Sequence, residues 1–400
     1  MPDAPPPSRT LHYHTWRTRS ITVDGAAYAV ATKPGLTGQG RDEAIQLLAG
    51  RVVVSPGSTV VNFQSGSGLF AAAAALGRSA AHVYCSDRSI AAAEATRRTL
   101  EANGVSNATV ACGHGSAPFG SGLRADVVAI RIPTEKLALL QLLADAFGLL
   151  KVGGQCCIAG ATNEGVKSAA SVLKDLFGNA TVLATEQGFR AVMAVKRSPT
   201  PVDTTVMANT LLQHDDFHPI DVVLRGQPTR LFSRPGVFSW QHLDDATAIL
   251  ADVMRVRPGD DVLDLGCGSG PLGLTAARLG ATGRVCMVDV DSEAVRCASR
   301  AVTVAGLTTC DVRTSDVGAA VLGERFDVVV TNPPFHVGKL TDLDVPAQFI
   351  ADAHAVLRPG GSLQLVANRT LPYERIVQEC FGNLTTMHDG PRFKVLSAMR

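Results

Sequence analysis

The sequence lacks any long uninterrupted apolar run. No stretch approaches the roughly 18 uncharged apolar residues that a membrane-spanning helix needs, which excludes a helical membrane protein. Residues 1–10 (MPDAPPPSRT) also lack the apolar core of a secretory signal. We therefore expect a cytoplasmic protein with no membrane association and a disordered tail over residues 1–20.

Paired cysteine motifs are also missing. The nine cysteines include no C-x-x-C and lie mostly inside apolar stretches such as RVCMVDV and GGQCCIAG, which is typical of reduced core residues and not of a disulfide framework or a zinc site. His214 and His218 have a gap compatible with metal ligands, but no third ligand or helical context accompanies them. No metal is predicted.

Net charge is small, at +1, but it is unevenly distributed along the 400 residues. Lys and Arg outnumber Asp and Glu by 19 to 13 in residues 1–200, a balance of +6, whereas residues 201–400 have 18 against 23, a balance of −5. A chain of this length favours two domains, and the two halves should attract different partners.

The same sequence unit is present twice. Residues 60–104 align without a gap on residues 262–306, and the similarity continues in later pairs such as ADVVAIRIP with FDVVVTNPP and LLKVGGQCCIAG with VLRPGGSLQLVA. Both halves should therefore have the same fold. We divide the chain into a tail (1–20), a first copy (21–198), a linker (199–220) and a second copy (221–400).

Each copy alternates β-branched runs with Ala-rich stretches, a pattern typical of parallel strands connected by helices. The predicted fold class is α/β, with two tandem Rossmann-like domains, each a mostly parallel seven-stranded sheet covered by helices on both faces. The second copy is predicted to contain strands near 261–265, 285–289, 310–313, 327–331 and 362–367, helices near 271–279, 292–305, 345–356 and 371–380, and a closing antiparallel pair, TTMHD and FKVLSAM.

A glycine-rich turn follows the first of these strands, in VLDLGCGSGPLG. Gly266, Gly268 and Gly270 permit a tight turn and let a ligand approach the backbone, and Asp264 can accept hydrogen bonds from ligand hydroxyl or ammonium groups. The turn suits either a dinucleotide or S-adenosylmethionine.

Two further acids follow the next strands. Asp289 ends the second strand, where a carboxylate suits the two hydroxyls of a ribose. Asp316 follows the third strand and can accept a hydrogen bond from an adenine amino group, although an isolated acid there can also be a turn residue. Asp291 is interpreted as a helix cap.

The fourth strand ends in Asn332-Pro333-Pro334-Phe335-His336. Two consecutive prolines stop the strand and stiffen the corner. The Asn332 side-chain carbonyl and the Pro333 backbone carbonyl can each accept one N–H of an exocyclic amino group, and Phe335 can stack on the base that carries it. This corner favours methyl transfer to an amine over hydride transfer.

These residues resemble the class I S-adenosylmethionine-dependent methyltransferases of the N-P-P-[FY] group, and more closely the bacterial rRNA guanine-N2 methyltransferases of the RsmC and RlmG type. The resemblance rests on NPPFH, PGVFSWQHLD, LVANRTLPYE, RFKV and the two-copy layout, and covers nearly the whole chain. Trp240-Gln241-His242 departs from the smaller or charged residues common in that family, which leaves substrate specificity near this loop open.

The resemblance implies S-adenosylmethionine as cofactor and ribosomal RNA or a ribosomal subunit as partner, with the chain expected to be a monomer. It places Asp264, Gly266, Gly268 and Gly270 on the methionine side, Asp289 on the ribose and Asp316 on the adenine. It assigns the guanine to the corner, with Asn332, Pro333, Pro334 and Phe335 as the catalytic residues, and folds Pro235–Ser239, including Phe238, over the cofactor.

The first copy has lost this chemistry. Asn62 stands in place of Asp264, Gln64 in place of Gly266, and Arg131-Ile132-Pro133 in place of the Asn-Pro-Pro corner. An arginine side chain cannot accept a hydrogen bond, so this copy should be non-catalytic. Its positive balance and the mixed bases and aromatics of HYHTWRTRS suggest that it recruits RNA.

The predicted activity is methylation of a guanine N2 in small-subunit 16S rRNA. The alternatives are the large-subunit 23S rRNA, a protein-glutamine or adenine N-methyltransferase, and an RNA-binding or ribosome-assembly protein without turnover. A nicotinamide oxidoreductase is the least favoured because it leaves the Asn-Pro-Pro-Phe corner unexplained.

Overall fold

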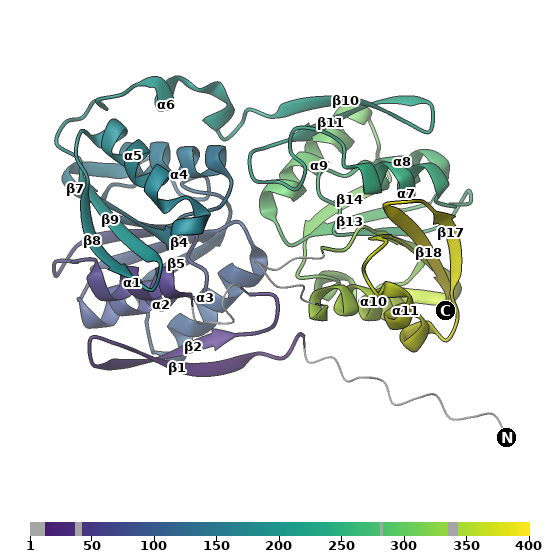
Figure 1. Ribbon diagram of the computed structural model, residues 1–400, viewed down its shortest axis with the longest axis horizontal. Coiled ribbons are helices and arrows are strands. Elements are labelled where there is room, and N and C mark those ends of the chain that lie inside the picture. Colours follow the sequence, from purple (N-terminus) through teal and green to yellow (C-terminus); the bar gives the residue numbers. More distant parts are fainter. Residues whose placement is uncertain (1–12, 37–41, 281–282, 335–342) are drawn as a thin grey trace. The chain divides into compact units, whose positions relative to one another are not determined.

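The computed structural model describes residues 13–36, 42–280, 283–334 and 343–400. They form two compact units (Figure 1). The N-terminal unit contains residues 16–216, and the C-terminal unit contains residues 217–400 together with residues 13–15. In the part of the chain that is described, no helix is long and apolar enough to cross a bilayer.

The N-terminal unit begins with a hairpin and continues as alternating strands and helices. Its strands are β1 (Arg17–Val23), β2 (Ala26–Thr32), β3 (Thr59–Phe63), β4 (His82–Asp87), β5 (Ala108–Cys112), β6 (Ala125–Arg131), β7 (Leu150–Ala161), β8 (Thr181–Glu186) and β9 (Phe189–Val195). Its helices are α1 (Glu43–Arg51), α2 (Leu69–Ala72) with the π-helical turn η2 (Ala73–Gly77), α3 (Ile90–Ala102), α4 (Lys136–Leu149), η3 (Thr162–Glu164), α5 (Val166–Phe177), α6 (Thr205–Ala208) and η4 (Thr210–Leu212).

The C-terminal unit repeats this order. Its strands are β10 (His218–Leu224), β11 (Gln227–Ser233), β12 (Val262–Leu265), β13 (Val285–Asp289), β14 (Cys310–Thr314), β15 (Phe326–Thr331), β16 (Leu357–Asn368), β17 (Thr385–Asp389) and β18 (Phe393–Met399). Its helices are α7 (Asp245–Val253), α8 (Pro271–Gly280), α9 (Ser292–Ala305), η5 (Ala319–Val321), α10 (Asp344–Val356) and α11 (Tyr373–Phe381).

The two large sheets have the same topology, which confirms the predicted duplication. Their strand orders are β5-β4-β3-β6-β7-β9-β8 and β14-β13-β12-β15-β16-β18-β17. Six strands of each sheet run in the same direction, and the strand that is sixth in the order, β9 or β18, runs antiparallel to both of its neighbours. The order in which successive strands are added to the sheet reverses beside β12, where the parallel strands β13 and β15 flank it on opposite sides, and ligands of open α/β sheets collect at such a point.

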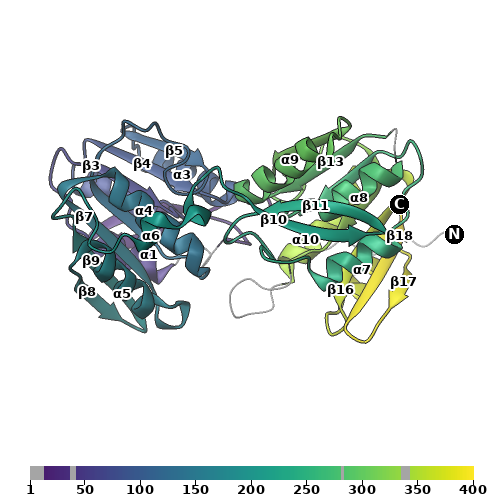
Figure 2. The ribbon, with the colours of Figure 1, turned by 90° about the horizontal axis from the view of Figure 1, so that it is seen from above.

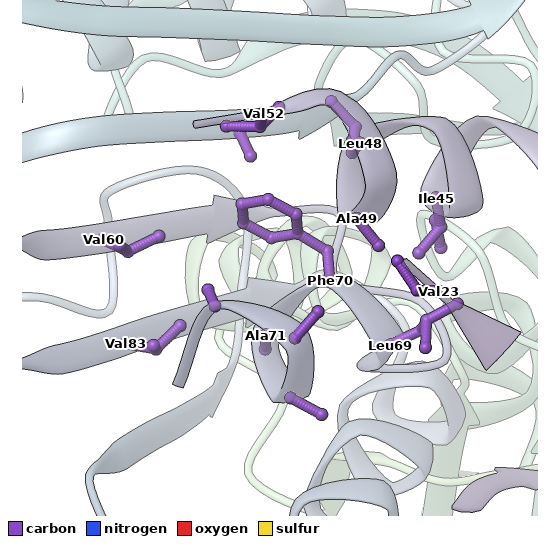
Figure 3. Packing of buried hydrophobic residues seen from close by; sticks show 14 of the residues in the cluster. Val23, Ile45, Leu48, Ala49, Val52, Val60, Leu69, Phe70, Ala71 and Val83 are labelled. Atoms are coloured by element: carbon purple, nitrogen blue, oxygen red, sulfur yellow. The ribbon is translucent and has the colours of Figure 1, made fainter. Parts of the chain in front are cut away.

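Helices cover both faces of each sheet because successive strand residues point to opposite sides. In the C-terminal unit, Val262 packs with residues of α7, α8 and α9, whereas the next residue, Leu263, packs with residues of α10 and α11. In the N-terminal unit too, residues on the two faces of the sheet pack in two separate clusters. Figure 3 shows one of its layers, in which the buried Phe70 of α2 packs among Leu48, Val52 and Val60.

Each unit also has a hairpin. The segment LRGQPTRLFSRPGVFSWQHLDDATAILADVM predicts a short strand, a turn and a leading helix, which β11 and α7 match, but neither hairpin was predicted. β1 pairs with β2, and β10 pairs with β11, in full antiparallel register. The β10–β11 hairpin lies beside α7 and α9 (Figure 2). Residues 17–20 therefore belong to β1, and the predicted tail over residues 1–20 is wrong for them; residues 1–12 lie outside the described residues.

Two other boundaries also need correction. The predicted linker, 199–220, contains α6, η4 and the start of β10, because its polar composition did not reveal these short elements. β16 begins at Leu357, earlier than the predicted 362, since Leu357 pairs with Phe326 before a bulge that includes the Pro359-Gly360-Gly361 turn residues.

None of the nine cysteines, all of which lie in the described part of the chain, forms a disulfide, and six of them are buried. Burial raises the pKa of the Cys85 thiol to about 12, and the same cause raises the pKa of Cys157 to about 12. These thiols therefore stay protonated and unreactive near neutral pH.

Candidate active site

The glycine turn between β12 and α8 is open toward solvent at one position. Gly266, Gly268 and Gly270 all have positive φ angles, of 77°, 53° and 88°. A Cβ atom on Gly266 would approach the Phe349 ring at 2.9 Å, and one on Gly270 would approach Ala298 at 3.2 Å, so these two glycines combine positive φ angles with tight packing. A Cβ on Gly268 would meet nothing within 4 Å. Gly268 is where a ligand can touch the backbone.

Asp264 lies beneath this turn and is fully buried. Its Oδ2 accepts a hydrogen bond from the Gly273 N–H at 2.8 Å, which ties the end of β12 to the first turn of α8. Its Oδ1 has no hydrogen-bond partner among the described residues. A buried acceptor without a partner is costly, so this oxygen is available to a ligand donor.

Burial raises the pKa of Asp264 to about 7; the Gly273 N–H opposes this shift, and the Asp289 charge adds to it. Between about pH 4 and pH 7 the folded protein keeps a proton here that the unfolded chain has released, so the free energy of unfolding falls as pH rises through this window.

The Asp264→Asn variant should lose this pH dependence. From pH 5 to pH 8 we expect the cofactor-free variant to gain roughly 2–3 kcal/mol in unfolding free energy relative to the natural chain, measured by urea denaturation. Asn62 shows that a neutral amide fits the equivalent position of the N-terminal unit, where its Nδ2 donates to the Ala129 carbonyl at 3.2 Å. If the unfolding free energies of the two proteins changed with pH in the same way, Asp264 could not be the group whose raised pKa causes the pH dependence.

Asp289 ends β13 and braces the glycine turn from the side. Its Oδ2 accepts from the Gly268 N–H at 2.8 Å, and its Oδ1 accepts from the Asp291 N–H at 2.9 Å. Each carboxylate oxygen has a further lone pair. Asp291 caps α9 by accepting from the Glu293 N–H, as predicted from its position.

Asp316 lies in the turn after β14, where its Oδ1 accepts a hydrogen bond from the Tyr13 hydroxyl at 3.1 Å. Parallel strands place Asp289 and Asp316 at the same edge of the sheet, since β13 and β14 are neighbours. The structure thus brings the three predicted acids to the carboxyl ends of three adjacent strands.

The Asn332 side chain is held in a fixed orientation at the end of β15. Its Nδ2 donates to Asp244 Oδ2 at 3.1 Å and to Thr247 Oγ1 at 2.9 Å. Asp244 is itself the N-cap of α7 and accepts from the Thr247 N–H. With the amide so placed, the Asn332 Oδ1 makes no hydrogen bond to any described residue and can accept one from a substrate.

A cavity joins this corner to the glycine turn. Its lining includes Phe238, Gly266, Gly268 and Asn332, together with the helix-start residues Asp244 and Thr247. Pro333 is buried and Pro334 is exposed. Phe335, predicted to stack on the target base, and His336 lie outside the described residues.

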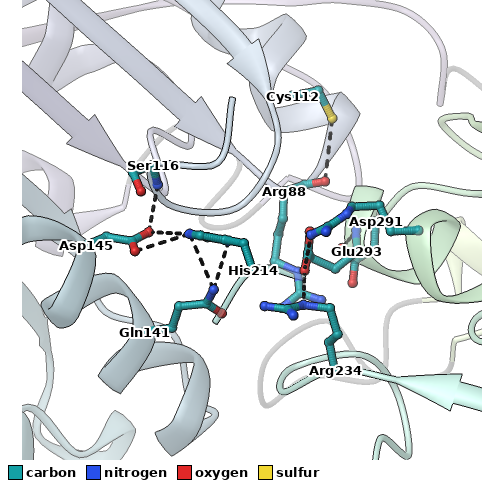
Figure 4. Close-up of polar contacts among 10 residues, drawn as sticks. Arg88, Cys112, Ser116, Gln141, Asp145, His214, Arg234, Asp291 and Glu293 are labelled. Atoms are coloured by element: carbon teal, nitrogen blue, oxygen red, sulfur yellow. Dashed lines mark hydrogen bonds and ion pairs between the residues drawn. The ribbon is translucent and has the colours of Figure 1, made fainter. Parts of the chain in front are cut away.

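The loop carrying Phe238 is anchored at two positions that precede it. Arg234 and Glu293 form a buried ion pair, with Nε 2.6 Å from Oε2 (Figure 4), and Val237 packs against Ala294 and Cys297 of α9. Phe238 itself remains 61% exposed. The anchors therefore present its ring at the rim of the cavity.

The corresponding corner of the N-terminal unit is closed. Arg131, at the position of Asn332, pairs with Asp42 at 3.1 Å and Glu164 at 2.7 Å and donates to the Ile132 carbonyl. Ile45, at the position of Thr247, fills the space in front of Gly66, where an added Cβ would approach its Cδ1 at 2.6 Å. The space that is open at Gly268 is thus filled by a side chain in the first copy.

Sequence reasoning missed Asp244 and Thr247 as partners of Asn332. Asp244 had a detectable local signal, because an Asp before an apolar-periodic stretch indicates a helix N-terminus. Their contact with Asn332 spans more than 80 residues of sequence and had no local signal.

His214 and His218 belong to different units and have different partners. His214 Nε2 lies 2.9 Å from Asp145 Oδ2 in the N-terminal unit (Figure 4), whereas His218 begins β10 and its ring contacts Trp240. The described residues contain no group of three or more His, Cys, Asp or Glu that can hold a metal ion.

Known proteins resemble this chain over both units. The methyltransferase small domain family matches residues 27–193 and 228–397. The ribosomal RNA small subunit methyltransferase C of Hahella chejuensis is 33% identical over 276 residues, 69% of this chain and 78% of that protein. Its counterpart in Pseudomonas syringae pv. syringae is 31% identical over 264 residues, 66% of this chain and 76% of that protein.

A solved structure is similar over nearly the full length. It is described as the T. thermophilus 16S rRNA N2 G1207 methyltransferase (RsmC) in complex with AdoMet and guanosine. It shares 29% sequence identity with a TM-score of 0.81, covering 97% of this chain and 98% of that chain. The two-unit architecture is therefore common to both proteins.

Proposed function

Since the chain belongs to the methyltransferase small domain family and, within it, to the RsmC-type rRNA methyltransferases, we propose that it methylates the exocyclic N2 amino group of a guanine in 16S rRNA. The guanine that we assign is the one corresponding to G1207, the target in the description of the T. thermophilus relative. S-adenosylmethionine is the methyl donor.

The C-terminal unit fits this cofactor. The buried Asp264 Oδ1 has no partner among the described residues, and Gly268 has open space in front of it. We assign Asp264, Gly266, Gly268 and Gly270 to the methionine side. The remaining contacts are assigned to Asp289 for the ribose, Asp316 for the adenine, and Phe238 as a cover at the cavity rim.

The observation that carries the proposal is the fixed Asn332 amide. Because Asp244 and Thr247 take both described bonds of Nδ2, Oδ1 can accept one N–H of a guanine amine. The Pro333 carbonyl is assigned the second N–H, and Phe335 is assigned the base. An amine held by two acceptors turns its lone pair out of conjugation with the purine ring and toward the donor methyl.

No strong base is required for this reaction. Bound S-adenosylmethionine supplies the methyl group: the nitrogen–carbon bond forms as the methyl–sulfur bond breaks, the sulfonium becomes a neutral thioether, and one amine proton then leaves to solvent. The protein's contribution is positioning, which can account for several kcal/mol of the barrier. A guanine must leave its stack to reach the corner, as in other enzymes that modify bases.

We assign RNA recruitment to the N-terminal unit. One support is the positive charge balance of residues 1–200, which would attract the phosphate backbone of RNA. The other is the filled space in front of Gly66, which leaves this unit without a cofactor role. Trp16 contributes less than expected to such a surface. It packs against the cluster of Leu36 and α3 alanines, with the Arg98 guanidinium 4.8 Å from its ring.

The proposal is tested by incubating the purified chain with radiolabelled S-adenosylmethionine and either 16S rRNA or 30S subunits, followed by digestion to nucleosides. We expect the label in N2-methylguanosine. Label that stays with protein after RNase digestion, or appears in a methylated adenosine, would instead assign the enzyme to one of the other amino methyltransferases.

A further inference from the structure

The described part of the segment that precedes the N-terminal unit packs on the C-terminal unit. Residues 13–15 belong to the C-terminal unit, although the chain enters the N-terminal unit at Trp16. The Tyr13 ring is 6% exposed and packs in the cluster that contains Val317 and Phe349. Its hydroxyl donates to Asp316 Oδ1. Tyr13 therefore contacts the acid to which the adenine is assigned.

The turn that carries Asp316 is held from several sides. Ser315 N–H donates to the Asp289 carbonyl at 2.8 Å, which ties the turn to the end of β13. Val317 adopts a left-handed conformation, with φ of 53°, which is unfavourable for a β-branched residue. The surrounding contacts must maintain this strained backbone.

Asp352 of α10 supplies one of these contacts. Its Oδ2 accepts from the Gly318 N–H at 2.9 Å and lies 3.1 Å from His14 Nε2, while Gln348 donates to its Oδ1. A Cβ on Gly318 would lie 2.8 Å from the Asp352 Cβ, so the two elements pack closely. Tyr13 and His14 thus act on neighbouring parts of one turn.

The N-terminal unit has a corresponding turn without the tyrosine. Gly113, His114, Gly115 and Ser116 lie at the same offset of 202 from Ser315, Asp316, Val317 and Gly318, and Gly115 has a φ of 55°.

The histidine contact also recurs there. Ser116 N–H donates to Asp145 Oδ2 at 2.7 Å, and His214 contacts the same carboxylate (Figure 4). The residue before His214 is Gln213. The histidine–aspartate contact therefore occurs in both copies, whereas the tyrosine–acid pair belongs to the active copy.

We propose that Tyr13 is a positioning residue for cofactor recognition: its hydroxyl holds one oxygen of Asp316 so that the carboxylate presents its remaining acceptor sites to the adenine 6-amino group. The inference rests on the proposed function of the C-terminal unit. It also gives the segment that leads into the inactive copy a role in the active site of the other copy.

The test uses the full-length Tyr13→Phe variant, which keeps the buried ring and removes the hydroxyl. The natural chain should bind S-adenosylhomocysteine more tightly than S-inosylhomocysteine, whose base has an oxo group in place of the 6-amino group. We expect the ratio of the two affinities to fall by about tenfold or more in the variant, mainly because the adenine compound binds more weakly.

Tyr28→Phe is the matched control, because Tyr28 is a similarly buried tyrosine of the N-terminal unit, 5% exposed, and it should leave the discrimination unchanged. A general folding defect would instead weaken both ligands equally. Retention of full discrimination by Tyr13→Phe would overturn the inference, as would an equal loss for both ligands. The titration contains no RNA, so failure of the natural chain to methylate rRNA would separately contradict the proposed function.

Discussion

Replacing Asn332 by alanine should lower kcat for methyl transfer by about 10²- to 10³-fold, the usual cost of removing a preorganised hydrogen-bonding group that acts on the reacting atom. The amide is held by Asp244 and Thr247, so its carbonyl needs no reorganisation when the amine arrives. Binding of S-adenosylmethionine should change little because no cofactor contact is assigned to Asn332. Single-turnover methylation and calorimetric titration measure the two quantities separately.

Arg131→Ala is the matched control for this substitution. Arg131 occupies the same corner of the N-terminal unit, where it pairs with Asp42 and Glu164. Its loss should reduce stability because two partly buried carboxylates lose a partner, but kcat should remain within about twofold of the natural value for the folded protein. An Asn332→Ala enzyme with kcat within threefold of the natural value would rule out the amide as the acceptor for the guanine amine.

Replacing Asp289 by alanine should weaken S-adenosylmethionine binding by about 10²-fold or more. The carboxylate is assigned the ribose hydroxyls and also accepts the N–H groups of Gly268 and Asp291, so the substitution removes ligand contacts and loosens the glycine turn. Lost hydrogen bonds to a charged group cost about 1.5–3 kcal/mol each. Calorimetric titration should give one bound cofactor per natural chain.

Asp87→Ala separates the two effects of this substitution. Asp87 accepts from the N–H groups of Gly66 and Ser89, each at 3.0 Å, and so repeats the structural role of Asp289 in the unit whose ligand space is filled. We expect Asp87→Ala to lose about as much unfolding free energy as Asp289→Ala does, and to keep the Kd of the natural chain for S-adenosylmethionine. Weakened binding in Asp87→Ala to the same degree as in Asp289→Ala would show that stability, and not ribose contact, explains the Asp289 effect.

The sheets and helices were predictable because their signals are local. The predicted strand over 285–289 and helix over 292–305 match β13 and α9, since β-branched runs and an Asp-capped amphipathic stretch have clear periodicities. The hairpins were missed although each has a recognisable turn. Asp24-Gly25 and Arg225-Gly226 have consecutive positive φ angles, a geometry that Asp-Gly in particular indicates from sequence.

The candidate site was predictable in its glycines, acids and corner, but not in the contacts that orient them. No periodicity or motif reveals that Asp244 holds Asn332, that Ile45 fills the space before Gly66, or that Tyr13 contacts Asp316 across 303 positions. Such contacts arise from the packing of elements that are far apart in the chain, and only the folded structure shows them.

The most direct test of the activity is to map methylated nucleosides by mass spectrometry in rRNA from a strain that lacks this protein. We expect the loss of one N2-methylguanosine from 16S rRNA, at the position corresponding to G1207, and its restoration by the natural gene and by Arg131→Ala, but not by Asn332→Ala. An unchanged 16S map, or a loss confined to 23S rRNA, would contradict the assignment.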